Sequence, residues 1–177
     1  AASDVYKRQL EHFTAVGVAV SEMCLQPLLE YGVKAYADHQ KGLCTYDVEQ
    51  VVLAIVVTTG IASIFLTKDC TPDYNSGLAH AVFYALTSYP VIEKLHLHGE
   101  VVGFGVLLAL LVDRQEEEFE KIYKLNREIG LPVSLKEIEI TEDEWEESMN
   151  RIPEMSDVAH YPYRVTKEML RDAMDRL

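Results

Sequence analysis

The residues best suited to chemistry in this sequence are histidines. Two of the six stand out by context: His80 in the small-residue segment GLAHA, and His98 in LHGE, at the start of an apolar stretch. Neutral imidazole is a good ligand for zinc or iron. Two histidines without a fixed short motif are also typical of core histidines bonded to backbone carbonyls, and His96 competes with His98 for any ligand role. The pattern therefore leaves a metal site and a structural interpretation open.

Two helices must bring these histidines together. On one straight helix, residues 18 positions apart would lie about 27 Å from each other. Pro90 makes a single helix unfavourable between them. A helix, a turn and a second helix could place both imidazoles at one point. The spacing therefore predicts that any shared metal lies between a helix beginning near Leu78 and an apolar helix over Val101–Val112.

Helical periodicity runs through nearly the whole chain. The pattern predicts a helix over Leu10–Gln40 that Pro27 would kink or restart. It also predicts a core helix over Val51–Phe65, apolar on most faces, with Thr45 as the N-cap. A loop over Lys68–Gly77 follows. No sustained period-two strand pattern occurs.

The second half of the chain is also predicted to be helical. We expect a helix over Leu78–Thr87, a break at Pro90 followed by a linker, and the apolar helix already described. Amphipathic surface helices then follow Asp113, with caps at Thr141 and Thr166. The fold prediction is all-α: a helical bundle in which two buried helices are wrapped by amphipathic ones.

The domain prediction is a single helical domain over residues 10–177. The first nine residues, AASDVYKRQ, resemble translated sequencing-adapter sequence, so residues 1–9 are predicted to be non-native. The other interpretation of this segment is a frayed helix start. If the segment is non-native, we expect the chain to lack its true N-terminal portion.

Charge and composition exclude several function classes. The net charge of −13 disfavours nucleic-acid binding, which needs clustered Lys and Arg, and docking on an anionic membrane. The longest apolar run, Val51–Leu66, has 16 residues, fewer than the roughly 20 that span a bilayer. The three cysteines fit free thiols in a reducing compartment, so we expect a cytoplasmic protein without membrane or nucleic-acid partners.

Several segments, in order along the chain, resemble one known family. GLAHAVFYAL at Gly77–Leu86 and LHGEVVGFGVLLAL at Leu97–Leu110 resemble the helical C-terminal domain of the iron-containing alcohol dehydrogenase superfamily, and most closely its glycerol dehydrogenase branch. GLPVSLKEIEI at Gly130–Ile140 and VAHYPYRVTKEMLRDAM at Val158–Met174 resemble further family segments. The resemblance covers about residues 10–177.

The resemblance implies a metal site and a reaction. The family's histidine ligands fall on His80 and His98, and their separation matches the glycerol dehydrogenase branch, which favours zinc over iron. His160 matches a family histidine that could line the cleft. Glu100 could orient a metal-bound histidine, or be a first-turn carboxylate favoured by the helix dipole. The implied activity is NAD-dependent hydride transfer on a small polyol, hydroxy-ketone or 2-oxo acid, in an enzyme that could be a homo-oligomer.

The sequence also departs from the family pattern. The family segment carrying the third ligand, an aspartate, and the dinucleotide-binding domain are not found here, so the resemblance implies no cofactor-binding or catalytic residue in this chain beyond the two histidines. Phe83 stands where the family often has a second histidine. We therefore expect the isolated chain to be an inactive fragment of a dehydrogenase. The rival interpretations are a lyase similar to 3-dehydroquinate synthase, and a metal-free helical interaction domain.

Overall fold

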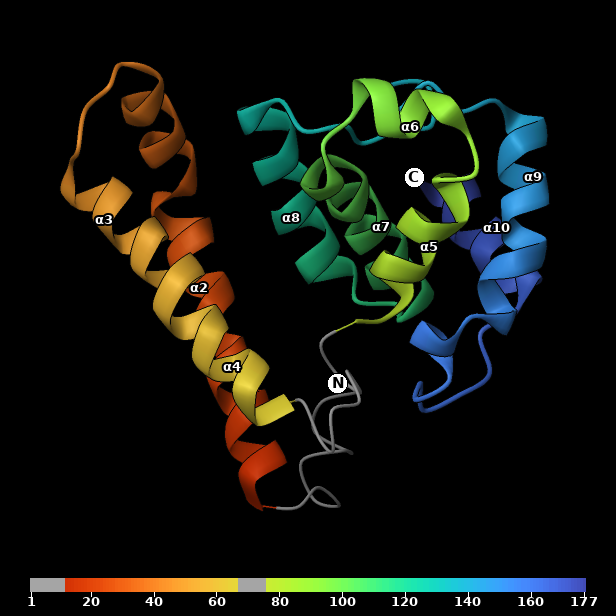
Figure 1. Cartoon of the computed structure of the whole chain (residues 1–177), viewed down its shortest axis with the longest axis horizontal. Helices are drawn as coiled ribbons and strands as arrows, with labels where there is room; N and C mark the ends of the chain where they lie inside the picture. Colours follow the sequence, from red (N-terminus) through yellow and green to blue (C-terminus); the bar gives the residue numbers. More distant parts are fainter. Residues whose placement is uncertain (1–11, 67–75) are drawn as a thin grey trace. The chain divides into compact units, whose positions relative to one another are not determined.

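The structure is a computed structural model that describes residues 12–66 and 76–177. The chain divides into two compact units, Ala1–Asn75 and Ser76–Leu177 (Figure 1). Regular structure in the described ranges is helical, with no strand. The all-α prediction is therefore confirmed. Residues 1–9 and most of the predicted loop at 68–77 lie outside the described residues.

The N-terminal unit is a helical hairpin. Helix α2 (His12–Gln40) packs against a second helical stretch made of α3 (Tyr46–Leu53), the π-helical turn η1 (Ala54–Thr58) and α4 (Thr59–Leu66). A Cβ added at Gly17 would lie 2.8 Å from the Cβ of Phe65, so this glycine allows α2 to approach α4 closely. Helix α2 continues through Pro27 without restarting.

A buried carboxylate fixes the turn of the hairpin. Asp38, which is 8% exposed, accepts hydrogen bonds from Lys34 Nζ at 2.6 Å and from Thr45 Oγ1 at 2.8 Å. Thr45 occupies the predicted N-cap position of α3 but makes no side-chain cap bond, and its hydroxyl donates to Asp38.

The second stretch of the hairpin is less buried than its composition predicts. Only 11% of the most apolar window within Tyr46–Leu66 is buried, although we expected a core helix here. The reason is that, among the described residues of this unit, α2 is the only helix packed against it, so a single stripe including Ala54 and Ala62 is covered. The stretch is long and apolar enough to cross a membrane. One such helix is weak evidence, since the core helix of a soluble protein can have the same composition.

The C-terminal unit contains six α-helices among its described residues: α5 (Leu78–Leu86), α6 (Pro90–Leu95), α7 (His98–Val112), α8 (Glu116–Ile129), α9 (Glu142–Arg151) and α10 (Lys167–Arg176). The short 3₁₀ turns η2 (Ile152–Glu154) and η3 (Ser156–Val158) connect α9 to the last segment. A linker was expected after the break before Pro90. Pro90 instead begins α6, because proline is well suited to the first turn of a helix.

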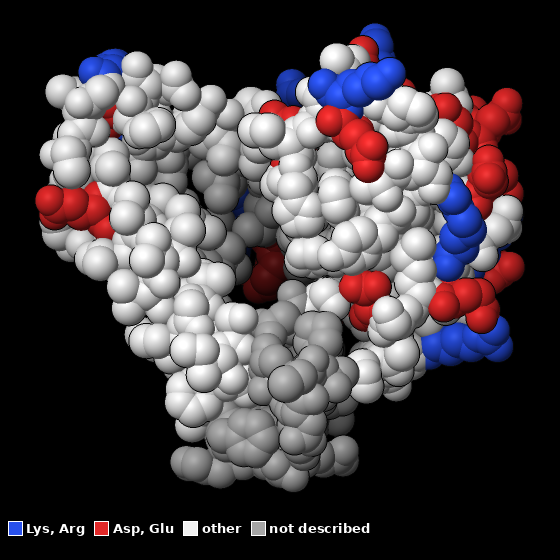
Figure 2. All heavy atoms as spheres, viewed as in Figure 1, with Lys and Arg blue, Asp and Glu red and all other residues white. Residues whose placement is uncertain are grey.

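Helix α7 is the centre of the C-terminal unit. It packs against α5, α8 and α10, and Phe104, Leu107 and Leu108 are fully buried. The surface helices start as predicted. Thr141 Oγ1 accepts from the backbone N–H of Glu144 at 3.3 Å, and Thr166 caps α10 in the same way. Their charged side chains gather on the outer face of this unit (Figure 2).

Candidate metal centre

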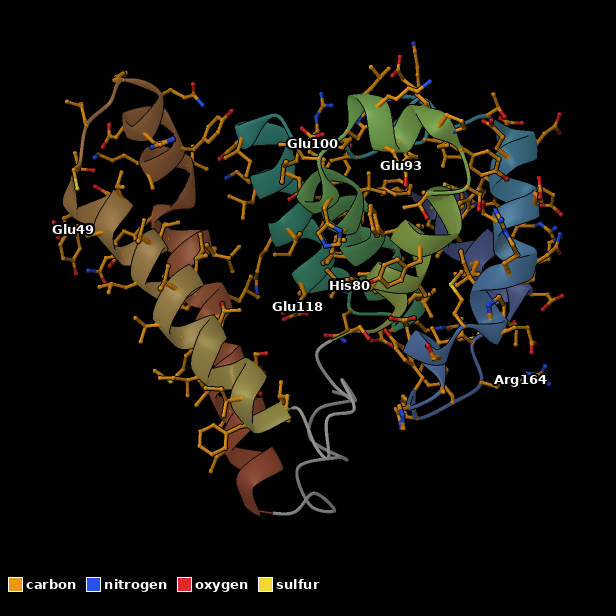
Figure 3. All side chains as sticks on the ribbon, in the orientation of Figure 1. Glu49, His80, Glu93, Glu100, Glu118 and Arg164 are labelled. Atoms are coloured by element: carbon orange, nitrogen blue, oxygen red, sulfur yellow. The ribbon has the colours of Figure 1, made fainter. Side chains whose placement is uncertain are left out.

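The structure brings His80 and His98 together from two helices. His80 lies in the first turn of α5, and His98 is the first residue of α7. Their ring centroids are 5.5 Å apart, with the ring planes inclined at 45°. His80 lies on the side of α5 that faces α7 (Figure 3). Two helices therefore bring the imidazoles together, as the spacing predicted, but the short helix α6 and not a simple turn lies between them, and metal binding by the pair stays a prediction.

A close helix crossing sets this geometry. A Cβ added at Gly105 of α7 would lie 2.6 Å from the carbonyl oxygen of Ala79 and 2.9 Å from its Cα. Only glycine allows the two backbones to approach this closely. Because Ala79 directly precedes His80, the contact holds the first turn of α5 against α7. The other glycine of this part of α7 differs, because a Cβ at Gly103 would make ordinary contacts at 3.7 Å.

Aromatic rings cover one side of the histidine pair. Phe83 meets the ring of His98 edge to face, with centroids 4.3 Å apart, and Tyr84 lies 6.3 Å from His80. Phe83 is partly buried against the core, whereas His98 and Tyr84 are exposed. The pair is thus backed by an apolar ring on one side and remains accessible on another.

The local electrostatics favour neutral imidazole at His80. Burial, followed by the positive charge that His98 can carry, lowers the pKa of His80 below its usual 6.5, while Asp157 of η3 acts in the opposite direction. A metal binds the neutral ring and not the imidazolium ion. His80 is therefore kept in the form that can act as a ligand.

The donor set fits zinc in type but is incomplete in number. Imidazole nitrogen is a common zinc ligand, and catalytic zinc sites generally use three protein ligands. Within residues 12–66 and 76–177, however, no three His, Cys, Asp or Glu side chains are grouped so that they could hold one ion. The pair would therefore supply two ligands of a larger set.

Glu100 contacts the neighbouring histidine. Its carboxylate accepts a hydrogen bond from the backbone N–H of Leu97 at 2.9 Å and lies 3.5 Å from Nδ1 of His96. These contacts fit the alternative of a first-turn carboxylate at the start of α7. His96 itself is 11% exposed, and its Nε2 lies 3.7 Å from the carboxylate of Glu139. Both His96 and Glu100 line a separate cleft of about 390 Å³.

His160 lies exposed in the turn that follows η3. Its predicted place at the edge of a cleft stays a prediction. Phe83 was noted in the sequence only as a departure from the family pattern, and its packing against His98 was missed. The signal was present, since residues three apart on a helix share a face, which puts Phe83 beside His80.

Comparisons with known proteins relate this chain to glycerol dehydrogenases. It is 32% identical over 134 residues to glycerol dehydrogenase of Escherichia coli, a match that covers 73% of this chain and 33% of that protein. It is 35% identical over 126 residues to glycerol dehydrogenase of Thermotoga maritima, covering 68% of this chain and 31% of that protein. The chain thus spans about a third of the length of these curated relatives. No family model matches the chain.

A solved structure shows the same relationship. The crystal structure of a probable glycerol dehydrogenase from Sinorhizobium meliloti matches with a TM-score of 0.75 and 25% identity, covering 91% of this chain and 44% of that one. The sequence and structure matches together show that the chain is related to the C-terminal helical part of glycerol dehydrogenases, within the iron-containing alcohol dehydrogenase fold. The family resemblance found in the sequence is confirmed.

Proposed function

We propose that this chain is the metal-binding helical part of an NAD-dependent polyol dehydrogenase, with His80 and His98 as two of the metal ligands. The observation that carries this proposal is the convergence of the two imidazoles from α5 and α7, with ring centroids 5.5 Å apart. The similarity to glycerol dehydrogenases supports it independently.

Each residue of the centre would have a defined part in the reaction. His80 and His98 would hold the ion through neutral ring nitrogens, and Phe83 would fix the orientation of the His98 ring. Zinc is favoured over iron, and when bound it would act as a Lewis acid that polarises the substrate hydroxyl. The exposed side of the pair would be the approach for a small polyol.

The remaining parts of the reaction would come from outside the described residues. We propose that an aspartate completes the ligand set, as the resemblance implies, and that NAD is the hydride acceptor. The isolated chain should then show no dehydrogenase activity. Steady NADH formation from glycerol by this chain alone would contradict that expectation.

The proposal also covers the cellular location, the substrate class and the assembly of the protein. We propose a cytoplasmic enzyme that acts on a small polyol and assembles as a homo-oligomer, without nucleic-acid or membrane partners. The acidic net charge of −13 and the similarity to glycerol dehydrogenases support the choice of partners. A metal-free interaction domain is the alternative that a binding experiment would separate.

Zinc titration by calorimetry tests the proposed site. The full chain should bind zinc weakly, because water must complete the coordination of an ion held by two imidazoles. Binding should fall as the pH drops through about 6.5, since protonated imidazole cannot ligate. His80→Ala and His98→Ala should each abolish binding.

His96→Ala is the matched control for the titration, because it removes a histidine two positions from His98 without touching the pair. This variant should bind zinc nearly as the parent does. Loss of binding in His96→Ala with binding retained in His98→Ala would show that the wrong histidine has been chosen. Absence of binding in the parent chain would contradict the metal site.

A further inference from the structure

The helix that carries His80 begins without a cap of its own. The N-cap residue of α5 is Gly77, which has no side chain to accept a hydrogen bond from the first turn. The first N–H groups of a helix have no partner within the helix and need one elsewhere. Here the backbone N–H of Leu78 donates to the hydroxyl of Tyr161, 83 residues later in the chain, at 3.3 Å.

Tyr161 is held in place by the residues around it. Its ring lies over Gly77, where an added Cβ would meet ring atom Cε2 at 3.5 Å. It also meets the ring of Tyr163 edge to face at 5.7 Å, and the Tyr163 hydroxyl donates to Asp113, the C-cap residue of α7. Two tyrosines thus connect the start of α5 to the end of α7.

Burial raises the pKa of Tyr161 to about 12, with a further contribution from the negative charge of Asp113. The phenol therefore remains protonated and neutral at neutral pH. It can act as a fixed neutral acceptor for the Leu78 N–H.

His80 lies two residues after Leu78, within the same first turn. That turn is fixed on one side by the Gly105 crossing and on another by the Tyr161 hydroxyl. We infer that Tyr161 is a positioning residue for His80: by capping α5 in place of a local side chain, it fixes the imidazole beside His98. The effect of this contact on metal affinity rests on the proposed function, whereas its effect on the ring of His80 does not.

Tyr161→Phe in the full chain tests the inference, because it removes the hydroxyl and keeps the ring over Gly77. In the metal-free protein, we expect faster hydrogen exchange at the Leu78 amide. We also expect a shift of the His80 imidazole resonances in ¹H–¹⁵N spectra, with those of His98 nearly unchanged. Zinc affinity should weaken by about threefold to tenfold, which is the scale expected when a helix loses its N-terminal cap.

Two further variants separate positioning from general damage. Tyr163→Phe also removes a tyrosine hydroxyl, but this hydroxyl donates to Asp113 at the end of α7. This variant should leave the His80 resonances as in the parent. Gly77→Ser, added to Tyr161→Phe, supplies a local cap, and its Cβ fits at an ordinary contact distance. This double variant should return both the His80 resonances and the zinc affinity toward the parent values.

The spectra of the metal-free variants test the positioning role of Tyr161 whether or not the chain binds zinc. Unchanged His80 resonances in Tyr161→Phe would overturn it, as would equal shifts in His80 and His98 or failure of Gly77→Ser to restore the parent state. Unchanged zinc affinity despite shifted resonances would overturn the role in metal binding. Failure of the parent chain to bind zinc would contradict the proposed function, and the resonances would still decide the positioning role.

Discussion

Two apolar helical stretches of similar composition have different environments in this chain. Tyr46–Leu66 in the N-terminal hairpin and α7 in the C-terminal unit are both rich in branched aliphatic residues, mainly Val and Ile in the first and Leu and Val in the second. Within its own unit the first leaves large side chains exposed, among them Val56 at 66% and Ile64 at 74%, whereas α7 has Phe104, Leu107 and Leu108 fully buried. The visible surface of the hairpin is correspondingly poor in charge, and that of the C-terminal unit is rich in it (Figure 2).

The difference lies in the number of neighbouring helices. Within residues 12–66, Tyr46–Leu66 packs only against α2, while α7 packs against α5, α8 and α10. An apolar composition therefore predicts a helix but does not set how much of it is covered. The histidine pair belongs to the well-covered unit, where a tight helix crossing can fix two side chains from different segments.

The largest expected difference between the two stretches comes from truncating a buried side chain of α7 and an exposed side chain of Tyr46–Leu66. Leu108→Ala should reduce the free energy of unfolding of the C-terminal unit by about 2–5 kcal/mol, because it leaves a cavity beside α7. Val56→Ala should change that of the hairpin by less than about 0.5 kcal/mol, because the side chain is largely exposed in its unit. Hydrogen exchange resolved by segment would measure both. A large decrease in the free energy of unfolding in Val56→Ala would show that another surface covers the hairpin.

Adding one methyl group at a glycine tests the helix crossing. Gly105→Ala should destabilise the C-terminal unit by about 1–3 kcal/mol and separate the two imidazoles, because its Cβ would overlap the backbone of Ala79. Chemical denaturation and zinc titration would measure the two effects.

Gly103→Ala in the same helix and Gly60→Ala in the hairpin are the matched controls. A Cβ at Gly60 meets nothing within 4 Å, and one at Gly103 makes ordinary contacts. Both variants should be neutral, or more stable by up to about 1 kcal/mol through better helix propensity. A Gly105→Ala variant as stable as these two would refute the claim that the crossing needs glycine.

Acid should affect the two units in different pH windows, which is the smallest expected effect. Burial and the charge of His98 lower the pKa of His80 in the folded C-terminal unit below its usual 6.5. As the pH falls below about 6.5, the imidazole of His80 is therefore protonated more readily in the unfolded chain than in the folded one. The C-terminal unit loses stability over this range. In the hairpin, hydrogen bonds from Lys34 and Thr45 lower the pKa of Asp38 from its usual 3.8. The stability from Asp38 is complete above that value and is lost only as the pH falls through its lower folded pKa.

Segment-resolved hydrogen exchange in metal-free buffer would measure this pH effect. Between about pH 7.5 and about pH 5.5, which bracket the histidine pKa, only the C-terminal unit should lose protection. His80→Gln should make that loss smaller. An equal loss in the hairpin, or no change in His80→Gln, would contradict the assignment.

Local signals in the sequence predicted much of the fold. Helical periodicity gave the helices, and threonine followed three residues later by glutamate gave the capping box at Thr141. Thr45 occupies the predicted N-cap position of α3 without a side-chain cap bond, and the acceptor of its hydroxyl, Asp38 seven residues earlier, was not predicted. The linker after Pro90 was wrong because proline suits a first helical turn as well as it suits a break.

The histidine pair could be found from residue type, spacing and family resemblance. Its supporting contacts could not be found in full, because they depend on which segments meet in three dimensions. Nothing local links Tyr161 to Leu78, 83 residues away. Likewise, the coverage of Tyr46–Leu66 depends on the number of helices around it, which no periodicity reports.

Zinc-edge anomalous diffraction from crystals of the full chain grown with zinc would show directly whether His80 and His98 bind one ion. We expect one peak at about 2.0–2.1 Å from a ring nitrogen of each histidine. A peak beside His96, between Glu100 and Glu139, or no peak at the pair, would contradict it.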